Sequence, residues 1–506
     1  MLEAFVQGLA AVLQWNAFSF MLIGVALGFW VGLLPGLGGS TTLALLLPFI
    51  YTMQPVQAFA FLLGMHSVTA TTGDITSILF GIPGEGTTAA SILDGHEMAK
   101  NGEAGRALGA SLTSSLIGAL IGAFALAAAI PIVRPIVLSF GSPEFFMIAI
   151  LGIASIASLS GRGSRAMVRG FLAGCLGLMF AAVGSDPQAA NLRYTLGTLY
   201  LWEGLGLVPV LVGFFAIPEI VNLAVSGTTI AGGLPGGRLS GVFQGVKDTL
   251  RHWWLTIRCS LIGTYIGILP GLGGAVAQWM AYAHAVQSAK DPIDRDRFGK
   301  GDVRGVIGPG AANNSKEGGD LIPTVAFGIP GSSSMAILLG GFFLVGLVPG
   351  PDMLTRHLAV TYSMVWTIIL ANVITVSVSF LFLNHLAKLT LIRGSLLIPF
   401  LALLIFTGSY TNNNALGDLV VTLFFGVLGY FMVRFHWPRA PLVLGLVLGK
   451  VAERYLWIST ARYGTEWLGR PLVILLISLT ILVVVLPFIQ ERRARGRARR
   501  KAAHAA

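Results

Sequence analysis

Apolar residues fill most of this chain in long stretches, and polar positions fall mainly between these stretches. A helix needs about 20 apolar residues to cross the hydrocarbon core of a bilayer. Stretches of this character lie at 16–34, 106–133, 141–160, 170–184, 198–224, 335–350, 359–386, 395–409, 415–433, 440–458 and 471–489. Two more regions, 41–93 and 255–330, are interrupted by Gly, Pro and polar residues. The pattern predicts an all-α, polytopic integral membrane protein with about 12 membrane segments.

The composition agrees with a membrane protein. Of 506 residues, 55% are hydrophobic and 11% are charged, which excludes an ordinary soluble domain. The net charge of +11 is densest in the terminal ERRARGRARRK, and a basic tail after the last apolar stretch favours a lipid surface over nucleic acid. Cys175 and Cys259 lack the spacing of a metal site or a disulfide framework, so we interpret them as packing residues.

The basic residues predict an orientation, because short loops rich in Lys and Arg stay in the cytoplasm. Such loops contain Arg162, Arg165 and Arg169; Arg238, Lys247, Arg251 and Arg258; Lys388 and Arg393; and Arg434 and Arg439. With these loops inside, the C-terminus is also cytoplasmic. The N-terminal segment has no basic n-region and no cleavage site, which predicts an amphipathic interfacial helix rather than a removable signal peptide.

Two motifs occur twice. LLPGLGG at 33–39 returns as ILPGLGG at 268–274, and FGIPG at 80–84 returns at 327–331. The predicted crossings place the segment after the first FGIPG inside and the segment after the second outside, so the repeats are expected to be inverted. We divide the chain into a first repeat at 1–225, a cytoplasmic linker at 226–253, a second repeat at 254–490 and a basic tail at 491–506.

Both motifs place proline among glycines inside apolar sequence, which predicts broken or re-entrant helices at membrane depth. Matching interruptions in two repeats point to the binding site of a secondary transporter. The backbone would approach a ligand closely at Gly36, Gly38, Gly39, Gly271, Gly273 and Gly274. The alternative is that these glycines only allow close helix packing.

Polar residues precede and follow each FGIPG motif. The candidate substrate-binding residues are Thr71, Thr72, Gly73, Asn313 and Asn314 upstream, and Thr87, Thr88, Ser332, Ser333 and Ser334 downstream. Asp74 and Asp320, with Asn313 and Asn314, are candidates for a coupling-ion site, because intramembrane carboxylates are functional candidates and hard cations prefer oxygen ligands. The alternatives are helix capping for the hydroxyl and aspartate residues, and an exposed loop for Lys316 and Glu317.

These strings together resemble the large membrane subunit of the tripartite tricarboxylate transporters, the TctA family. The similarity covers nearly the whole length and includes FGIPGEGTTAASILDGHEMAKNGEAGRALG, ANNSKEGGDLIPTVAFGIPGSSSMAILLGG and APLVLGLVLGKVAE. The resemblance implies a bacterial inner-membrane permease that works with a small four-helix membrane subunit and a periplasmic solute-binding protein. It would import carboxylates with a Na⁺ or H⁺ gradient, by an elevator-like movement. The chain departs from the family pattern at Pro309-Gly310, Asp74 and Asp320.

Two other functions remain open from the sequence: a stand-alone cation-coupled carrier that needs no binding protein, and an ion-conducting membrane subunit of an energy-converting complex. The second would more often contain several intramembrane lysines and glutamates, which are sparse here. The chain has no P-loop ending in GK[ST] and no HExxH motif, so we expect neither enzyme activity nor a cofactor beyond the coupling ion.

Overall fold

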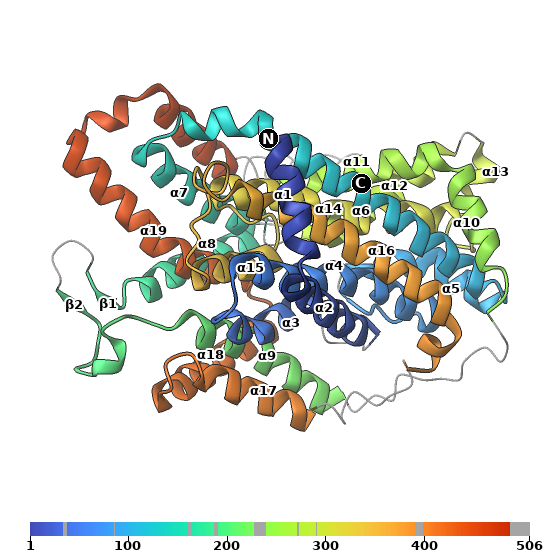
Figure 1. The fold of residues 1–506 in the computed structure, drawn as a ribbon, viewed down its shortest axis with the longest axis horizontal. Helices are drawn as coiled ribbons and strands as arrows, with labels where there is room; N and C mark the ends of the chain where they lie inside the picture. The colour runs from blue at the N-terminus through green and yellow to red at the C-terminus, as the bar shows by residue number, and fades with distance from the viewer. Residues whose placement is uncertain are drawn as a thin grey trace, which may run out of the picture.

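The computed structural model describes residues 1–33, 38–85, 87–159, 164–186, 191–226, 239–270, 273–289, 291–389 and 398–485. These residues are overwhelmingly helical (Figure 1). Within them the sheet structure consists of one short antiparallel pair, β1 (Gly184–Ser185) and β2 (Leu192–Arg193). The all-α prediction is confirmed.

The first half of the chain contains α1 (Leu2–Leu13), α2 (Trp15–Leu33), α3 (Gly39–Leu46), η1 (Leu47–Ile50), α4 (Pro55–Phe80), η2 (Thr88–Ser91), α5 (Ile92–Lys100), α6 (Ala104–Leu138), α7 (Ser142–Leu159), α8 (Ser164–Ala181), η3 (Leu199–Leu201) and α9 (Leu207–Ser226). The second half contains α10 (Val242–Arg251), α11 (Trp253–Ile268), α12 (Gly273–Ser288), α13 (Pro292–Arg295), α14 (Arg304–Phe327), α15 (Ser333–Leu344), α16 (Leu358–Leu389), α17 (Ile398–Tyr410), α18 (Leu416–Arg434), α19 (Ala440–Tyr463) and η5 (Glu466–Gly469). A further apolar helix follows at Pro471–Val485.

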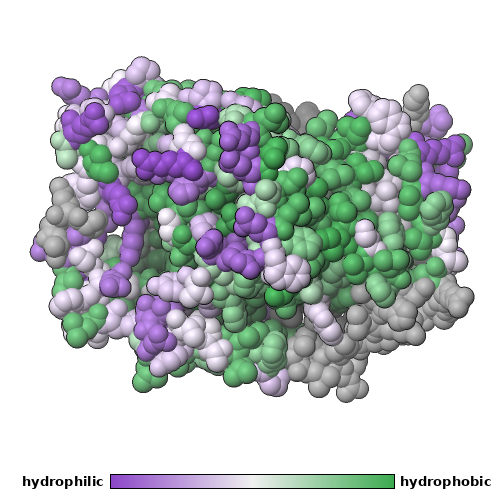
Figure 2. Space-filling view, in the orientation of Figure 1, coloured by the Kyte–Doolittle hydropathy of each residue, from purple (hydrophilic) through white to green (hydrophobic). Residues whose placement is uncertain are grey.

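The described helices support a multi-pass membrane protein. Five of them are long and apolar enough to cross a bilayer: Trp15–Leu33, Ala104–Leu138, Leu207–Val225, Leu358–Leu383 and Leu416–Arg434. Six shorter apolar helices accompany them, so the figure of about 12 segments stays a prediction. Large apolar side chains are exposed on many helices, and Figure 2 shows a broad apolar area across the middle of one face, as expected where lipid covers the protein.

The two halves repeat the same order of helices and pack reciprocally. Within each half, the helix before LPGLGG packs on the helix before FGIPG, as α2 on α4 and α11 on α14. Across the halves, α6 packs on α14 and α16 on α4, while α10 packs on α6 and α1 on α16. Figure 1 shows α7, α8, α9, α17, α18 and α19 grouped on the left and lower left, beside the central and right-hand helices that contain the motifs. The doubling therefore extends to tertiary contacts.

The interruptions lie at the motifs and not in the polar stretches beside them. Helix α2 ends at Leu33 and α11 at Ile268, in the two LPGLGG motifs, and α4 and α14 end at the two FGIPG motifs. The polar sequences around Thr71 and Asn313 lie inside α4 and α14, which run through them without a break. Most backbone groups in these stretches therefore bond within the helices. The exception is the carbonyl of Gly319, because Pro323 inside α14 has no amide to donate to it.

The predicted linker at 226–253 contains structure of its own. Residues 242–251 form α10, which packs against α6 so closely that a Cβ added at Gly245 would lie 2.0 Å from the carbonyl oxygen of Arg106. Arg106 Nε also donates to Asp248 Oδ2 at 2.6 Å. This helix is the counterpart of the N-terminal helix α1, which packs on α16 as α10 packs on α6.

Candidate functional site

The two LPGLGG motifs begin helices that face buried charged and hydroxyl residues. A Cβ at Gly39, the first residue of α3, would lie 2.9 Å from His66 Nδ1 and 3.2 Å from Glu85 Oε1. A Cβ at Gly274 would lie 2.2 Å from Lys316 Cε and 2.8 Å from Thr87 Cγ2. These two positions require glycine because neighbouring side chains occupy the space of a side chain.

The other glycines of these motifs differ from one another. Gly273 has φ +67°, a left-handed conformation that favours glycine, with open space around it. Gly38 has φ −73° and ψ 157°, an extended conformation open to any residue. The glycine requirement predicted for Gly38 therefore has no conformational basis. Gly36 and Gly271 lie outside the described residues.

The two FGIPG motifs make matching turns. Their first glycines, Gly81 and Gly328, end α4 and α14 with φ +67° and +69°. A Cβ on the last glycine, Gly84, would lie 2.6 Å from Gly73 Cα, and one on Gly331 would lie 2.8 Å from Asp320 Oδ1. Each turn thus folds back onto its own preceding helix. Gly73 lies inside α4 and acts as a packing residue, because Gly84 of the turn lies directly against it.

Asn313 and Asn314 are fully buried where helices of both halves meet. Asn313 Nδ2 donates to the carbonyl of Ala70 at 3.0 Å. Asn314 Nδ2 donates to Thr71 Oγ1 at 2.5 Å and to Asn372 Oδ1 at 2.6 Å. Among the described residues, the side-chain oxygens of both asparagines have no hydrogen-bond partner. Two buried amide oxygens are therefore available to a cation or a donor group.

The two candidate aspartates have different surroundings. Asp74 Oδ2 accepts from Ser111 Oγ at 2.9 Å and lies 3.4 Å from Asn313 Nδ2, so it is held between α6 and α14. Neither oxygen of Asp320 has a well-formed hydrogen bond within the part of the chain that the structure describes, although the side chain is fully buried. Neither aspartate caps a helix, since both lie inside α4 and α14. The capping alternative is therefore wrong for both residues.

A buried charged cluster lies beside these residues and was not among the sequence candidates. Lys316 Nζ pairs with Glu317 Oε1, and His66 Nε2 lies 3.2 Å from Glu317 Oε2. All three side chains are at most 4% exposed. The exposed-loop alternative for Lys316 and Glu317 is wrong, because both belong to the interior of α14. They follow Asn313, Asn314 and Ser315 in the same helix.

The candidate hydroxyl residues divide into two groups. Thr72 Oγ1 donates to the carbonyl of Val68 at 3.0 Å, Thr88 Oγ1 donates to the carbonyl of Glu85 at 2.9 Å, and Ser332 Oγ accepts from the amide of Met335 at 3.3 Å. These hydroxyls stabilise local backbone. Thr87 Oγ1 is buried and has no partner among the residues that the structure describes, and the Thr87 methyl group lies near the Lys316 side chain. Ser333 is exposed and Ser334 is buried.

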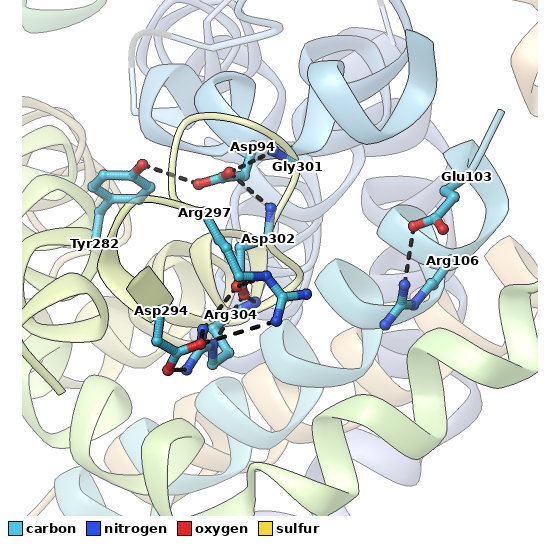
Figure 3. Close-up of polar contacts among 9 residues, drawn as sticks. All are labelled: Asp94, Glu103, Arg106, Tyr282, Asp294, Arg297, Gly301, Asp302 and Arg304. Atoms are coloured by element: carbon cyan, nitrogen blue, oxygen red, sulfur yellow. Dashed lines mark hydrogen bonds and ion pairs between the residues drawn. The ribbon is translucent and has the colours of Figure 1, made fainter. Parts of the chain in front are cut away.

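A second polar network ties α5 to the segment between α12 and α14, as Figure 3 shows. Asp94 accepts hydrogen bonds from Tyr282 Oη and from the amides of Gly301 and Asp302, each at 2.9 Å. Arg304 donates to Asp294 at 2.7 and 2.8 Å. The hydrogen bonds from Arg304 hold the pKa of Asp294 below its ordinary value. This network helps to fix α5 to the second half.

The arrangement offers groups that can bind charged ligands. Within the described residues, no group of three or more His, Cys, Asp or Glu side chains has the geometry to hold a metal ion. His66 and Glu85 lie near Gly39, the first residue of α3, and Lys316 and Thr87 lie near Gly274, in the first turn of α12. Within the described residues, α4 and α14 add unpaired amide and carboxylate oxygens. A small anion and a cation could be held there by different members of one cluster.

Comparison with known proteins places this architecture in a family. The model of the tripartite tricarboxylate transporter TctA family matches residues 18–444. An uncharacterised 52.8 kDa protein of the TAR-I ttuC' 3' region of Agrobacterium vitis is 30% identical over 477 residues, which cover 93% of each chain. An uncharacterised protein of the TAR-II ttuC' 3' region of Agrobacterium vitis is 30% identical over 236 residues, or 46% of this chain and 96% of that relative. No solved structure matches. The chain belongs to the TctA family of tripartite tricarboxylate transporters.

Proposed function

We propose that this chain is the large permease subunit of a transporter that imports organic carboxylates with a Na⁺ or H⁺ gradient. The observation that carries the proposal is the position of Lys316, a buried cation beside Gly274 and Thr87 from the two halves. A lysine in a membrane domain is costly unless it is paired or binds an anion. Lys316 supplies a positive charge that can bind a substrate carboxylate, and the glycines leave room for the substrate to approach the backbone.

The coupling ion would occupy the neighbouring oxygens. Asp74, Asp320, Asn313 and Asn314 have five side-chain oxygens without hydrogen-bond partners in the described structure. Hard cations prefer such oxygens to nitrogen ligands. A carboxylate on Lys316 and a cation on these oxygens would neutralise each other's charge, which favours their movement together.

Transport would proceed by exchange between two packing arrangements of the repeated halves. Helix α3 packs on α9, and α15 packs on α19. Their counterparts in the other half, α12 for α3 and α5 for α15, pack mainly on the helices that contain the motifs. Among the described residues, these counterparts have no comparable contact with α9 or α19. Inverted repeats that engage a common scaffold unequally can exchange roles, which opens the site to the other side. This exchange is the elevator-like movement that the family resemblance implies.

The remaining parts of the proposal concern placement and partners. The chain would lie in a bacterial inner membrane, with 226–253 and the C-terminal tail in the cytoplasm and repeats 1–225 and 254–490 inverted. A small four-helix membrane subunit and a periplasmic solute-binding protein would complete the transporter. Family membership supports these partners.

Uptake by reconstituted vesicles tests the proposal. The purified chain, with the small subunit, is reconstituted with and without the binding protein, and labelled citrate or related carboxylates are offered under imposed Na⁺ or H⁺ gradients. Uptake that needs both the binding protein and one gradient is expected. Uptake without the binding protein would instead identify a stand-alone carrier.

The buried Lys316, Glu317 and His66 also favour one competitor, an ion-conducting membrane subunit, because proton paths use such residues. In the same vesicles, that function predicts proton flux without any carboxylate. Proton flux without substrate, and no carboxylate uptake, would overturn the transporter proposal.

A further inference from the structure

A basic pocket lies where α10 meets α11. Figure 1 shows α10 and α13 at the right-hand end of the molecule. The first turns of α11, the C-terminal part of α12 and the start of α14 enclose a cavity of about 200 Å³. Its polar lining consists of Arg251, His252, Trp254, Arg258, Ser288 and Arg304. The proposed carboxylate site does not use any of these residues.

The charge of the pocket is only partly neutralised. Arg304 is bound by the carboxylates of Asp294 and Asp302. Arg251 and Arg258, in contrast, take part in no ion pair within the described part of the chain, and Arg258 Nε is buried without a hydrogen-bond partner. An unpaired donor on a cation inside a cavity is an anion-binding group.

The surface around the pocket has the character of a membrane interface. Trp253 and Trp254 are 57% and 56% exposed, and tryptophan is enriched at the boundary between lipid and water. The adjoining helix α10 exposes Phe243 and Leu250, and Lys247 lies over the Phe243 ring. A short amphipathic helix of this kind lies in the plane of the interface.

One face of α11 connects the pocket to apolar surface. Trp254, Arg258, Leu261 and Tyr265 follow one another at intervals of three or four residues, so they lie along one helix face. Trp254 and Arg258 line the pocket, while Leu261 and Tyr265 are more than half exposed beyond it. A molecule with a phosphate at one end and a hydrocarbon chain at the other matches this order.

We propose that the pocket binds the phosphate of an anionic phospholipid, with an acyl chain along Leu261 and Tyr265. Arg258 and Arg251 supply the charge, and Trp254 and Ser288 border the headgroup. The chemistry recognised is a phosphate anion, which a free phosphate shares. The apolar continuation along α11 favours the lipid as its source, and a net negative headgroup is favoured over a zwitterionic one because two arginines are uncompensated.

Native mass spectrometry of the purified chain in detergent tests the site. Phosphatidylglycerol, phosphatidylcholine or inorganic phosphate is titrated against the wild type and two variants. Arg258→Gln removes a charge from the pocket, and the matched control Lys247→Gln removes one from the exposed side of α10. A basic side chain near an anionic lipid contributes on the order of a fivefold gain in affinity.

The wild type is expected to bind phosphatidylglycerol more tightly than phosphatidylcholine. Arg258→Gln should weaken phosphatidylglycerol binding about fivefold, while Lys247→Gln should bind within about twofold of the wild type. Arg258 makes no ion pair, so the variant should keep its fold, which helicity and elution volume verify. Equal affinity in the wild type and Arg258→Gln would overturn the proposal, as would saturation of the pocket by inorganic phosphate with no gain from the lipid.

Discussion

Replacement of Lys316 separates its proposed role in binding from its role in folding. Lys316 pairs with Glu317, and Glu317 also lies 3.2 Å from His66. Lys316→Met removes the cation and keeps the volume and apolar stem of the side chain. Glu317 then retains His66 as a partner, so the folded protein loses one interaction without leaving an isolated charge.

The expected effect on transport follows from the burial of the cluster. Truncation of one partner of a buried charge pair costs about 2–5 kcal/mol, and 2 kcal/mol corresponds to roughly a 30-fold change in affinity. If Lys316 binds the substrate carboxylate, Lys316→Met should raise KM at least about 30-fold. Glu317→Gln should act differently, because it leaves Lys316 buried without its carboxylate, and destabilise the protein by about 3–5 kcal/mol.

Two measurements distinguish these outcomes: initial rates of carboxylate uptake into vesicles, and the unfolding midpoint in detergent. Lys450→Met is the matched control, because Lys450 lies on α19 and donates to the carbonyl of Glu203, away from the cluster. It should leave KM unchanged. A Lys316→Met protein that folds and transports with the wild-type KM would refute the substrate role of Lys316.

Three further predictions follow. Single cysteines in place of Gly102 and Asp352 should differ in whole cells, so that an impermeant thiol reagent labels only one of them, because the repeats are proposed to be inverted. Labelling of both cysteines from the same side would contradict the inversion. Asp74→Asn and Asp320→Asn should raise the Na⁺ or H⁺ concentration for half-maximal uptake, since asparagine keeps the shape but removes the charge; unchanged ion dependence in both variants excludes the ion role. Gly273→Val should reduce uptake while the protein stays in the membrane, because φ +67° is strained for a β-branched residue; wild-type uptake would assign this turn to ordinary packing.

The helical class and the doubling were predictable from sequence, because both depend on local patterns. Long apolar stretches identify membrane helices, and the repeated motifs predicted the interruptions at Leu33, Phe80, Ile268 and Phe327, where helices end. The polar stretches do not interrupt their helices, because serine, threonine and asparagine inside a helix can bond across to other helices as well as to a ligand. Asn314 does this with Thr71 and Asn372.

The charged cluster was hidden because its members are distant in sequence. His66 is in the first half, Lys316 and Glu317 are in the second, and only the packing of α4 near α14 brings them together. A lysine next to a glutamate is usually a solvated pair, so sequence alone could not identify a buried one. Gly39 and Gly274 were predicted as close-approach positions, and the structure identifies the side chains that approach them as His66 and Lys316.

The equivalent positions that follow the two FGIPG motifs make different contacts. Asp94 and Gly341 lie at the same distance along the chain from their motifs. Asp94 binds Tyr282 and two backbone amides in the network of Figure 3, whereas Gly341 packs against the apolar side chains of Leu47, Ile50 and Leu62. When a polar contact opens, water can replace its hydrogen bonds. When an apolar contact opens, hydrophobic surface is exposed to water, which costs free energy. In the proposed orientation the polar contact faces the cytoplasm, so the two ends of the pathway would open at different free-energy costs, although the helices around them are repeated.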